Sequence, residues 1–334
     1  MDPARVPQRG ASLRERIHRA VWLPTDPDGG PHRLRPQAVY PVLAFVVLAL
    51  GVNWPVMSVA LRSLTPIWMA VFRLVAAAAT LFVVTSATNR LVRPPRRDYP
   101  IVLSVAIVRL ALVFTLVFFG LEIVPPGRSS ILVWTAALWT VPIAVVFVGE
   151  HMTRMRWLGL AIGLGGLVLV FEPTRFDWTD GRVLLGHALL LCAALAQASV
   201  SVHVRHHSWG STPLALLPWQ LLVAVLPVLA IALAWEGVPR VDWSVGLVAN
   251  IAFQGIVVSG FAVWGQLTVL RSHPAISTNL ALMAVPVIGL LSSVIALGES
   301  LTASVVAGLI LVLAGVAVGR TAEAGAGRSA GLPG

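Results

Sequence analysis

The sequence predicts an all-α integral membrane protein with ten transmembrane helices, arranged as two inverted five-helix repeats. Three observations predict this fold. The 334-residue chain is 57% hydrophobic and 11% charged with a mean hydropathy of +0.85, which is too apolar for a soluble domain of this length. Apolar segments of about 20 residues follow one another from residue 38 onward. The second half of the chain also repeats a pattern found in the first.

The repeat is clearest in the motif Gly-Glu-x-x-Thr, which occurs at residues 149–153 and again at 298–302, 149 positions later. Nine positions are identical at this offset: Pro125/Pro274, Val145/Val294, Gly149/Gly298, Glu150/Glu299, Thr153/Thr302, Gly159/Gly308, Leu160/Leu309, Leu164/Leu313 and Gly166/Gly315. Matches held in register across ungapped apolar sequence indicate a duplicated unit. A further match at an offset of 147, Thr65-Pro66 with Thr212-Pro213, extends the unit back to its second helix. Each copy therefore contains five helices.

The apolar segments are 38–61, 66–87, 99–121, 128–148, 155–171, 183–204, 213–235, 245–270, 275–298 and 302–319. We expect each to cross the membrane, with the fifth and the tenth marginal in length. The expected division is a basic disordered cytoplasmic tail over 1–37, a first repeat over 38–171, a second repeat over 183–319 and a disordered cytoplasmic tail over 320–334. The first tail carries seven arginines among prolines and glycines and cannot bury enough apolar surface to fold alone.

The arginines predict the orientation, because all 24 basic residues of the chain are arginines. If the N-terminal tail is cytoplasmic, 17 arginines lie on the cytoplasmic side and five on the opposite side, which also collects acidic residues. This bias predicts a protein of the inner cell membrane with both termini in the cytoplasm. It also accounts for the net charge of +10, so no nucleic-acid partner is expected.

Five helices per copy is an odd number, so the second copy should enter the membrane from the opposite side. Inverted repeats are typical of secondary transporters that work by alternating access, with a substrate site between the halves. No nucleotide-binding motif is present, so we expect a proton gradient or solute exchange to drive transport and expect no cofactor. Proton coupling is possible in such a mechanism, and the oligomeric state is open between monomer and homodimer.

Two five-helix units that each end in Gly-Glu-x-x-Thr and a glycine-bearing helix resemble the EamA branch of the drug/metabolite transporter superfamily, over residues 38–320. Further matching residues are Asn53-Trp54, Thr65-Pro66, Arg73 and Pro286. The first copy departs from the pattern, with Ala137 at the position of Pro286 and its proline displaced to Pro142. The resemblance implies a central cavity lined by helices one to four and six to nine, with helices five and ten at the periphery. It also implies export or exchange of small metabolites or drugs.

Two arginines lie within predicted spans, Arg73 in the second and Arg109 in the third. Each costs about 2.5 to 3.5 kcal/mol on the insertion scale, so neither should face lipid. We interpret Arg109 as a fixed charge in the cavity that attracts a carboxylate or phosphate, and Arg73 as a substrate contact or a structural group at the repeat interface. The alternative for both is satisfaction by backbone carbonyls and water. No acidic residue lies mid-membrane, which favours an amino acid or related carboxylate, with a drug-like compound second.

The other candidate substrate contacts are amides and indole rings within the spans: Asn53, Trp54, Trp134, Gln254, Trp264 and Asn279. Such a lining suits an organic solute, although isolated amides in membrane helices also bond neighbouring helices. Glu150 and Glu299 are candidates for proton coupling or, alternatively, groups that tie consecutive helices together at their ends. Pro142 and Pro286 are hinge candidates or packing adaptations.

The sequence His203-Val-Arg-His206-His207 has the His-x-x-His-His spacing of membrane di-iron enzymes. Such enzymes need a second histidine box, and the other five histidines are scattered, so no metal site is expected. The cluster suits the C-terminal end of a cytoplasmic helix, where the dipole favours imidazole. A membrane-bound metalloenzyme and a lipid flippase are the alternatives to a transporter of small organic solutes.

Overall fold

The structure is a computed structural model that describes residues 36–87, 91–149, 154–172, 178–207, 211, 213–239, 241–272 and 281–329. Within these ranges every regular element is a helix. A bilayer demands this, because a helix satisfies its own backbone groups where no water is available. The tail predicted over 1–37 lies almost wholly outside the described residues, so its disorder stays a prediction.

Within its described residues, the first half contains five helical segments in the predicted order. They are α2 (Pro36–Ala60); α3 (Pro66–Ala87); η1 (Arg96–Asp98), α4 (Tyr99–Leu103), η2 (Ser104–Leu112) and α5 (Val113–Leu121), which together form the third; α6 (Pro126–Trp134) and α7 (Ala136–Val148), which form the fourth; and α8 (Arg154–Phe171). Both α3 and α6 begin with proline, whose missing amide is among the groups that a helix start leaves free.

The second half follows the same plan. Its elements are α9 (Gly181–His206); α10 (Pro213–Ile231) with η3 (Ala232–Glu236); α11 (Val245–Ala252), η4 (Phe253–Ala262) and α12 (Val263–Ser272), which together form the eighth segment; α14 (Ala284–Leu297); and α15 (Ala303–Ser329). Asp180 caps α9 by accepting the amide of Arg182 at 2.8 Å, and Ser244 caps α11 by accepting that of Leu247 at 3.1 Å. The last helix, α15, runs on into the stretch predicted as a C-terminal tail.

Eight helical segments of the described chain are long and apolar enough to cross a membrane. Two further apolar helices, Ala284–Leu297 and Ala303–Gly319, are shorter. The ninth predicted span begins at residue 275, and residues 273–280 lie outside the described part. The protein is therefore a multi-pass helical membrane protein, and the count of ten crossings stays a prediction.

Backbone irregularities recur in the two halves at nearly the offset of the sequence repeat. Gly149 and Gly298 both adopt the left-handed conformation at a helix end, with φ of 75° and 70°. This conformation favours glycine because it has no Cβ. The π-helical segments η2 and η4 begin 149 positions apart. The fourth segment breaks at Thr135 and the ninth at Met283. The duplication thus extends to local backbone geometry.

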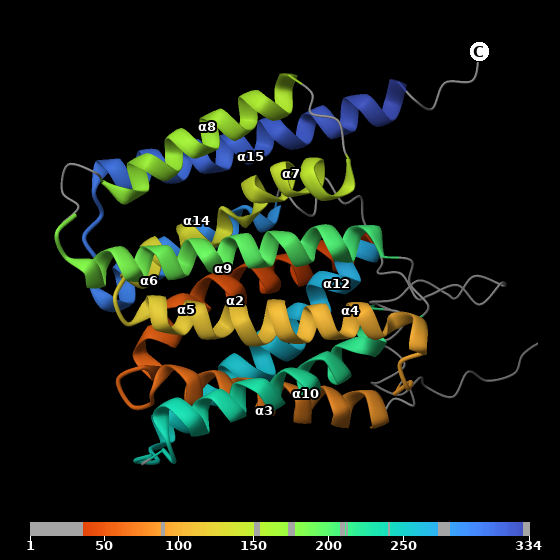
Figure 1. Cartoon of the computed structure of the whole chain (residues 1–334), viewed down its shortest axis with the longest axis vertical. Coiled ribbons are helices and arrows are strands. Elements are labelled where there is room, and N and C mark those ends of the chain that lie inside the picture. The colour runs from red at the N-terminus through yellow and green to blue at the C-terminus, as the bar shows by residue number, and fades with distance from the viewer. Residues whose placement is uncertain are drawn as a thin grey trace, which may run out of the picture.

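The fifth and tenth helices, α8 and α15, form a pair on one side of the molecule (Figure 1). A Cβ added at Gly159 would lie 2.6 Å from the Gly315 carbonyl oxygen, and one added at Gly308 would lie 2.7 Å from that of Gly166. No side chain fits at such distances, so the glycines permit close contact between one helix of each half. The pair occupies the peripheral position that the family resemblance implies.

The remaining helices form a bundle in which helices of the two halves pack against each other. The α3 helix packs on α10 and η4, and α14 packs on both α2 and α6. Phe118, Met69 and Leu74 are fully buried in this bundle. The helix ends form two faces. We call one the carboxylate face, where Glu236 ends η3 and where Glu122, Glu172 and Glu299 follow helix ends. The opposite one is the arginine face, with Arg93, Arg96, Arg97 and Arg205. In Figure 1 the end of α8 and the start of α15, which belong to the carboxylate face, lie at the left.

Candidate substrate site between the two halves

A buried polar network connects helices of the two halves within the membrane-spanning segments. Its centre is Arg73 of α3, whose side chain is 5% exposed. Its Nε donates to Ser259 Oγ at 2.9 Å and its Nη1 donates to Gln254 Oε1 at 3.4 Å, both on η4. The guanidinium also lies over the ring of Phe114 on α5, 4.4 Å from the ring centre. Three helical segments therefore hold one cation.

The backbone of η4 explains how two side chains of one helix reach the same arginine. Gln254 and Ser259 are five residues apart. In an α-helix, with 3.6 residues per turn, such residues point about 140° away from each other. A π-helix has i→i+5 hydrogen bonds and a wider turn, which brings residues five apart onto one side. The π-helical segment therefore gathers both acceptors at Arg73.

On the side of α2 the network ends in weak contacts. Met57 Sδ accepts from Arg73 Nη1 at 3.3 Å and from Asn53 Nδ2 at 2.8 Å. A thioether sulfur is a weak acceptor. The buried Asn53 Oδ1 has no hydrogen-bond partner in the described part of the chain. Asn53 and Arg73, both predicted substrate contacts, thus share a neighbour and retain unused hydrogen-bonding capacity.

A second connection to α2 runs from Gln254 through the amide of Asn250. Gln254 Nε2 donates to Asn250 Oδ1 at 2.6 Å, and Asn250 Nδ2 donates to the Val56 carbonyl at 2.9 Å. Every acceptor of Arg73 that the structure describes is neutral, and none is a carboxylate. The interface therefore holds a buried positive charge without a described counter-ion, which is the charge balance expected of a site for an anionic group.

Arg109, the second mid-span arginine, has different surroundings. It lies in η2, which packs against α9 and α10, and its side chain is half-buried. Among the described residues, no hydrogen-bonding or ion-pairing partner of its guanidinium is found, in contrast to Arg73. A cation in this position lacks compensation within the described chain. That makes Arg109 the stronger candidate for an anion contact that the substrate supplies.

The predicted aromatic contacts lie around the same interface. Trp54 on α2 is buried, and a Cβ added at Gly289 of α14 would lie 3.1 Å from its ring. Trp134, at the end of α6, packs between the two largest hydrophobic clusters, and Trp264 on α12 is half-buried. Asn279 lies outside the described residues. Of the predicted substrate contacts, the structure thus joins Asn53, Arg73 and Gln254 in one hydrogen-bonded network through Met57.

At the carboxylate face, Glu299 connects the second half to the first. Both of its oxygens accept the backbone amide of Gly127 at the start of α6, at 3.0 and 3.1 Å. The helix dipole favours a carboxylate there. Burial raises the pKa of Glu299, while the Gly127 hydrogen bond and the charge of Arg128 oppose the shift. Glu299 thus acts as a helix cap, and its raised pKa is compatible with a coupling role.

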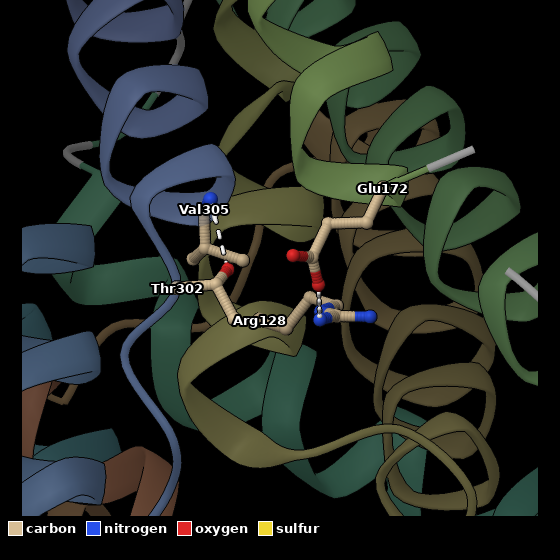
Figure 2. A network of polar contacts seen from close by, with 4 residues as sticks. All are labelled: Arg128, Glu172, Thr302 and Val305. Carbon is tan, nitrogen blue, oxygen red and sulfur yellow. Dashed lines mark hydrogen bonds and ion pairs between the residues drawn. The ribbon is translucent and has the colours of Figure 1, made fainter. Parts of the chain in front are cut away.

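Figure 2 shows the polar contacts beside this cap. Arg128 of α6 forms an ion pair with Glu172, which follows α8, and Thr302 Oγ1 accepts the amide of Val305 at 3.3 Å at the start of α15. The threonine of the second motif copy therefore caps the following helix. Glu150, in the first copy, lies outside the described residues, and its coupling role stays a prediction.

The hinge candidates lie on the C-terminal side of the two helix breaks. Pro286 is in the first turn of α14, three residues after the break at Met283. Its ring clashes with the carbonyl of residue 282 in a continuous helix, which accounts for that break. Pro142 lies inside α7, seven residues after the break at Thr135, and does not account for it. The hinge roles of both prolines stay predictions.

The histidine cluster at the arginine face contacts neighbouring groups of the helix ends. His207 Nε2 lies 3.2 Å from Oδ1 of the buried Asp98, and His206 Nδ1 lies 2.9 Å from the Val202 carbonyl oxygen. The rings of His203 and His207 meet edge to face. The described residues contain no group of three side chains placed to hold a metal ion. Helix-end packing therefore accounts for the observed contacts of the cluster.

Sequence reasoning missed three members of the central network, Met57, Phe114 and Ser259. A methionine or a serine in an apolar helix is common and carries no signal by itself. The repeat offers one clue for Ser259, because its counterpart 149 positions earlier is Leu110, next to Arg109. A polar residue that appears in one copy only marks a place where the halves have diverged.

These features define a class of protein: a multi-pass helical membrane protein built from two related halves, with a buried polar interface between them. The EamA-like transporter family matches residues 39–172 and 184–319, once in each half. The chain therefore belongs to this family, which confirms the resemblance, and the two matches agree with the predicted duplication. The protein is accordingly a transporter of the drug/metabolite type and not an enzyme.

Several relatives align over most of their length. The probable amino-acid metabolite efflux pump of Escherichia coli (strain K12) is 26% identical, over 82% of this chain and 92% of that protein. The uncharacterized transporter YoaV of Bacillus subtilis (strain 168) is 24% identical, over 81% and 92%. The probable terminal-alkyne amino-acid exporter of Streptantibioticus cattleyicolor is 27% identical, over 72% and 80%. One crystal structure shares the fold at a TM-score of 0.59 and 18% identity, covering 84% of this chain and 96% of the other.

Proposed function

We propose that this protein is a secondary transporter that moves a small organic metabolite across the inner membrane by alternating access between inverted five-helix halves. An amino acid or related carboxylate is the preferred substrate class, with a drug-like compound second, and the direction is export or exchange. Two of the relatives are named for amino-acid metabolites or amino acids, which supports this class.

One observation carries the substrate class. Arg109 lies mid-span without a hydrogen-bonding or ion-pairing partner in the described chain, and the acceptors of Arg73 there are all neutral. A carboxylate or phosphate on the substrate would supply the missing negative charge, whereas an organic cation would be repelled. Arg73 is held by several contacts and would have to exchange a weak one, the Met57 sulfur or the distant Gln254 oxygen. Arg109 needs no such exchange.

The driving force is a proton gradient or solute exchange, with Glu299 and Glu150 as coupling candidates. Glu299 bridges the two halves at the carboxylate face and its pKa is raised by burial, which supports a proton-dependent contact there. Flux driven by a pH gradient in Glu150→Gln and Glu299→Gln variants tests this role. Undiminished coupling in the double variant would exclude it.

Reconstitution into liposomes tests the substrate class directly. Labelled amino acids, organic acids and cationic dyes are offered to the parent protein and to Arg109→Gln. We expect carboxylate transport to fall about tenfold or more in the variant, because a charge-assisted contact is lost. Arg93→Gln, which removes an exposed arginine outside the span, is the matched control. Full carboxylate transport by Arg109→Gln would refute the anion site.

One structural feature favours a lipid flippase as the second candidate. A cavity of about 320 Å³ between α14 and α15 is lined only by apolar side chains. Leu291, Leu301 and Ile310 of this lining are also exposed at the protein surface. An acyl chain would fit such a lateral cavity. Movement of a fluorescent phospholipid between leaflets, at rates above those of protein-free liposomes, would favour this function over solute transport.

A further inference from the structure

Two tryptophans make matching contacts at opposite ends of one helix pair. The α3 and α10 helices come from different halves and lie side by side (Figure 1). Trp68, near the start of α3, donates its indole Nε1–H to the Gly237 carbonyl, which follows η3, at 2.8 Å. Trp219, in α10, donates its Nε1–H to the Val92 carbonyl, which follows α3, also at 2.8 Å. Each helix thus donates an indole hydrogen bond to the segment that follows the other helix.

The Trp68 contact lies at the carboxylate face and is reinforced by Glu236. This carboxylate accepts the hydroxyl of Thr65 at 2.5 Å, the amide of Ile67 at 3.0 Å and the amide of Trp68 at 3.1 Å. A side chain at the end of the seventh helix therefore caps the start of the second. Trp68 is buried, and its ring lies 5.8 Å from that of Phe72.

The Trp219 contact lies at the arginine face. Its ring meets Phe82 of α3 edge to face, with ring centres 5.3 Å apart. A second link between the halves, His207 with Asp98, lies at this same face. The two indole contacts are alike in kind but not in register, because Trp219 follows Trp68 by 151 positions while the starts of the helices are 147 apart. Trp219 therefore lies one turn further from the start of its helix than Trp68 does. The segment that follows α3 contacts it through the Val92 carbonyl.

We propose that Trp68 and Trp219 are paired latches, each closing one face of the protein, and that they open alternately during transport. This proposal rests on the alternating access proposed above. The halves must separate at one face while they stay joined at the other, and each indole–carbonyl bond crosses between the halves at one face only. Along α3, Arg73 lies between the two latches, so the central network can hold the halves together while one latch opens. Both indole hydrogen bonds are present in this structure, so α3 and α10 are joined at both faces.

A single cysteine reports on each face without any knowledge of the substrate. Thr80→Cys in a Cys192→Ser background leaves one thiol, because Cys192 is the only cysteine of the chain. Thr80 lies on α3, where its methyl group would be 3.6 Å from a Cβ added at Gly260 of η4, between the halves. Its rate of reaction with a membrane-impermeant maleimide is measured with the reagent on one side of the membrane and then on the other.

Trp68→Phe and Trp219→Phe keep an aromatic ring and remove only the indole donor. Loss of one hydrogen bond should shift the balance between open and closed about fivefold. We expect Trp68→Phe to raise labelling from the carboxylate face, and Trp219→Phe to raise it from the arginine face, each about fivefold. Glu236→Gln should act in the same direction as Trp68→Phe. Trp235→Phe and Trp157→Phe, which alter exposed tryptophans at the two faces, should change neither rate.

The outcomes separate this proposal from the proposed function. If the parent thiol reacts from both faces but Trp68→Phe and Trp219→Phe leave both rates unchanged, or change both rates equally, the latches are refuted and alternating access stands. If the thiol reacts from one face only in the parent and in every variant, alternating access itself is contradicted. Opposite shifts in the two variants support the latches. Glu236→Gln supplies a second test at the carboxylate face if Trp68→Phe does not fold.

Discussion

At the scale of single residues, Glu299 caps a helix of the other half and is also a titratable group whose pKa its surroundings shift. It accepts the Gly127 amide with both oxygens, and Arg128 lies close enough to stabilise its charge. Burial acts in the opposite direction and favours the neutral acid. The balance between these effects decides at what pH Glu299 loses its proton.

The raised pKa of Glu299 leads to a prediction about stability. The folded protein holds this proton more tightly than the unfolded chain, whose glutamates titrate near 4.5. The contribution of Glu299 to the free energy of unfolding therefore falls as the pH rises from that value through the raised one. We expect Glu299→Gln to flatten this part of the stability profile, measured as the melting temperature in detergent between about pH 4 and 8.

A matched variant separates this effect from a general change in charge. Asp242→Asn removes an exposed carboxylate at the same face and should leave the profile as it is. A profile for Glu299→Gln that follows the parent throughout would show that this carboxyl does not contribute to the pH dependence.

The residues of the central site could be predicted in type but not in arrangement. Polar groups inside apolar helices stand out in a sequence, and this identified Asn53, Arg73 and Gln254. Which of them meet depends on helix rotation and on the π-helical turn at Ser259, and no local pattern records either. The role of Glu236 was missed for a related reason, because its partners lie about 170 residues earlier in the chain.

At the scale of helices, the α8–α15 pair depends on glycine. A Cβ added at Gly166 would lie 2.6 Å from the Val312 amide nitrogen, whereas one added at the neighbouring Gly165 would meet nothing within 4 Å. We predict that Gly166→Ala destabilises the protein by about 1 to 3 kcal/mol through overpacking. Gly165→Ala should be neutral or stabilising by up to about 1 kcal/mol, because alanine favours the helix.

Thermal unfolding in detergent, followed by tryptophan fluorescence, compares these two alanine variants with the parent. Equal melting temperatures for both variants would contradict the close contact between α8 and α15. The two positions are adjacent in one helix, so composition and membrane depth are matched. Any difference between them therefore reports on the helix contact.

Helix positions were predictable because the bilayer imposes a length on each apolar segment. The five segments of the first half begin and end within three residues of their predicted limits. The π-helical segments and the breaks at Thr135 and Met283 were not predictable, since they depend on contacts between helices. Their recurrence in both halves shows that the duplicated unit carries these irregularities as part of its fold.

At the scale of the whole molecule, the two halves pack into each other along most of their helices. The second half supplies the carboxylates that cap two helix starts of the first, with Glu236 on α3 and Glu299 on α6. Helix α8 of the first half pairs with α15 of the second, and α2 packs against α14. Such an interface has the character of a complex between two subunits, which suits a unit that arose by duplication.

This arrangement predicts that the halves assemble without a covalent connection. Fragments 1–178 and 179–334, divided between α8 and α9, should co-purify when they are expressed together with a tag on one of them. Asp180 remains with α9, so its cap is preserved. The arginine bias acts on each fragment separately, and it should therefore insert the second fragment in its usual orientation.

Matched variants of α15 then test whether the contacts between α8 and α15 hold the two fragments together. A Cβ added at Gly308 would lie 2.7 Å from the Gly166 carbonyl, while one added at Gly319 would meet nothing within 4 Å. Gly308→Leu should therefore lower recovery of the partner fragment several-fold and Gly319→Leu should not. Equal recovery with both would mean that the halves associate through other surfaces, and no recovery of the unaltered pair would mean that they fold only as one chain.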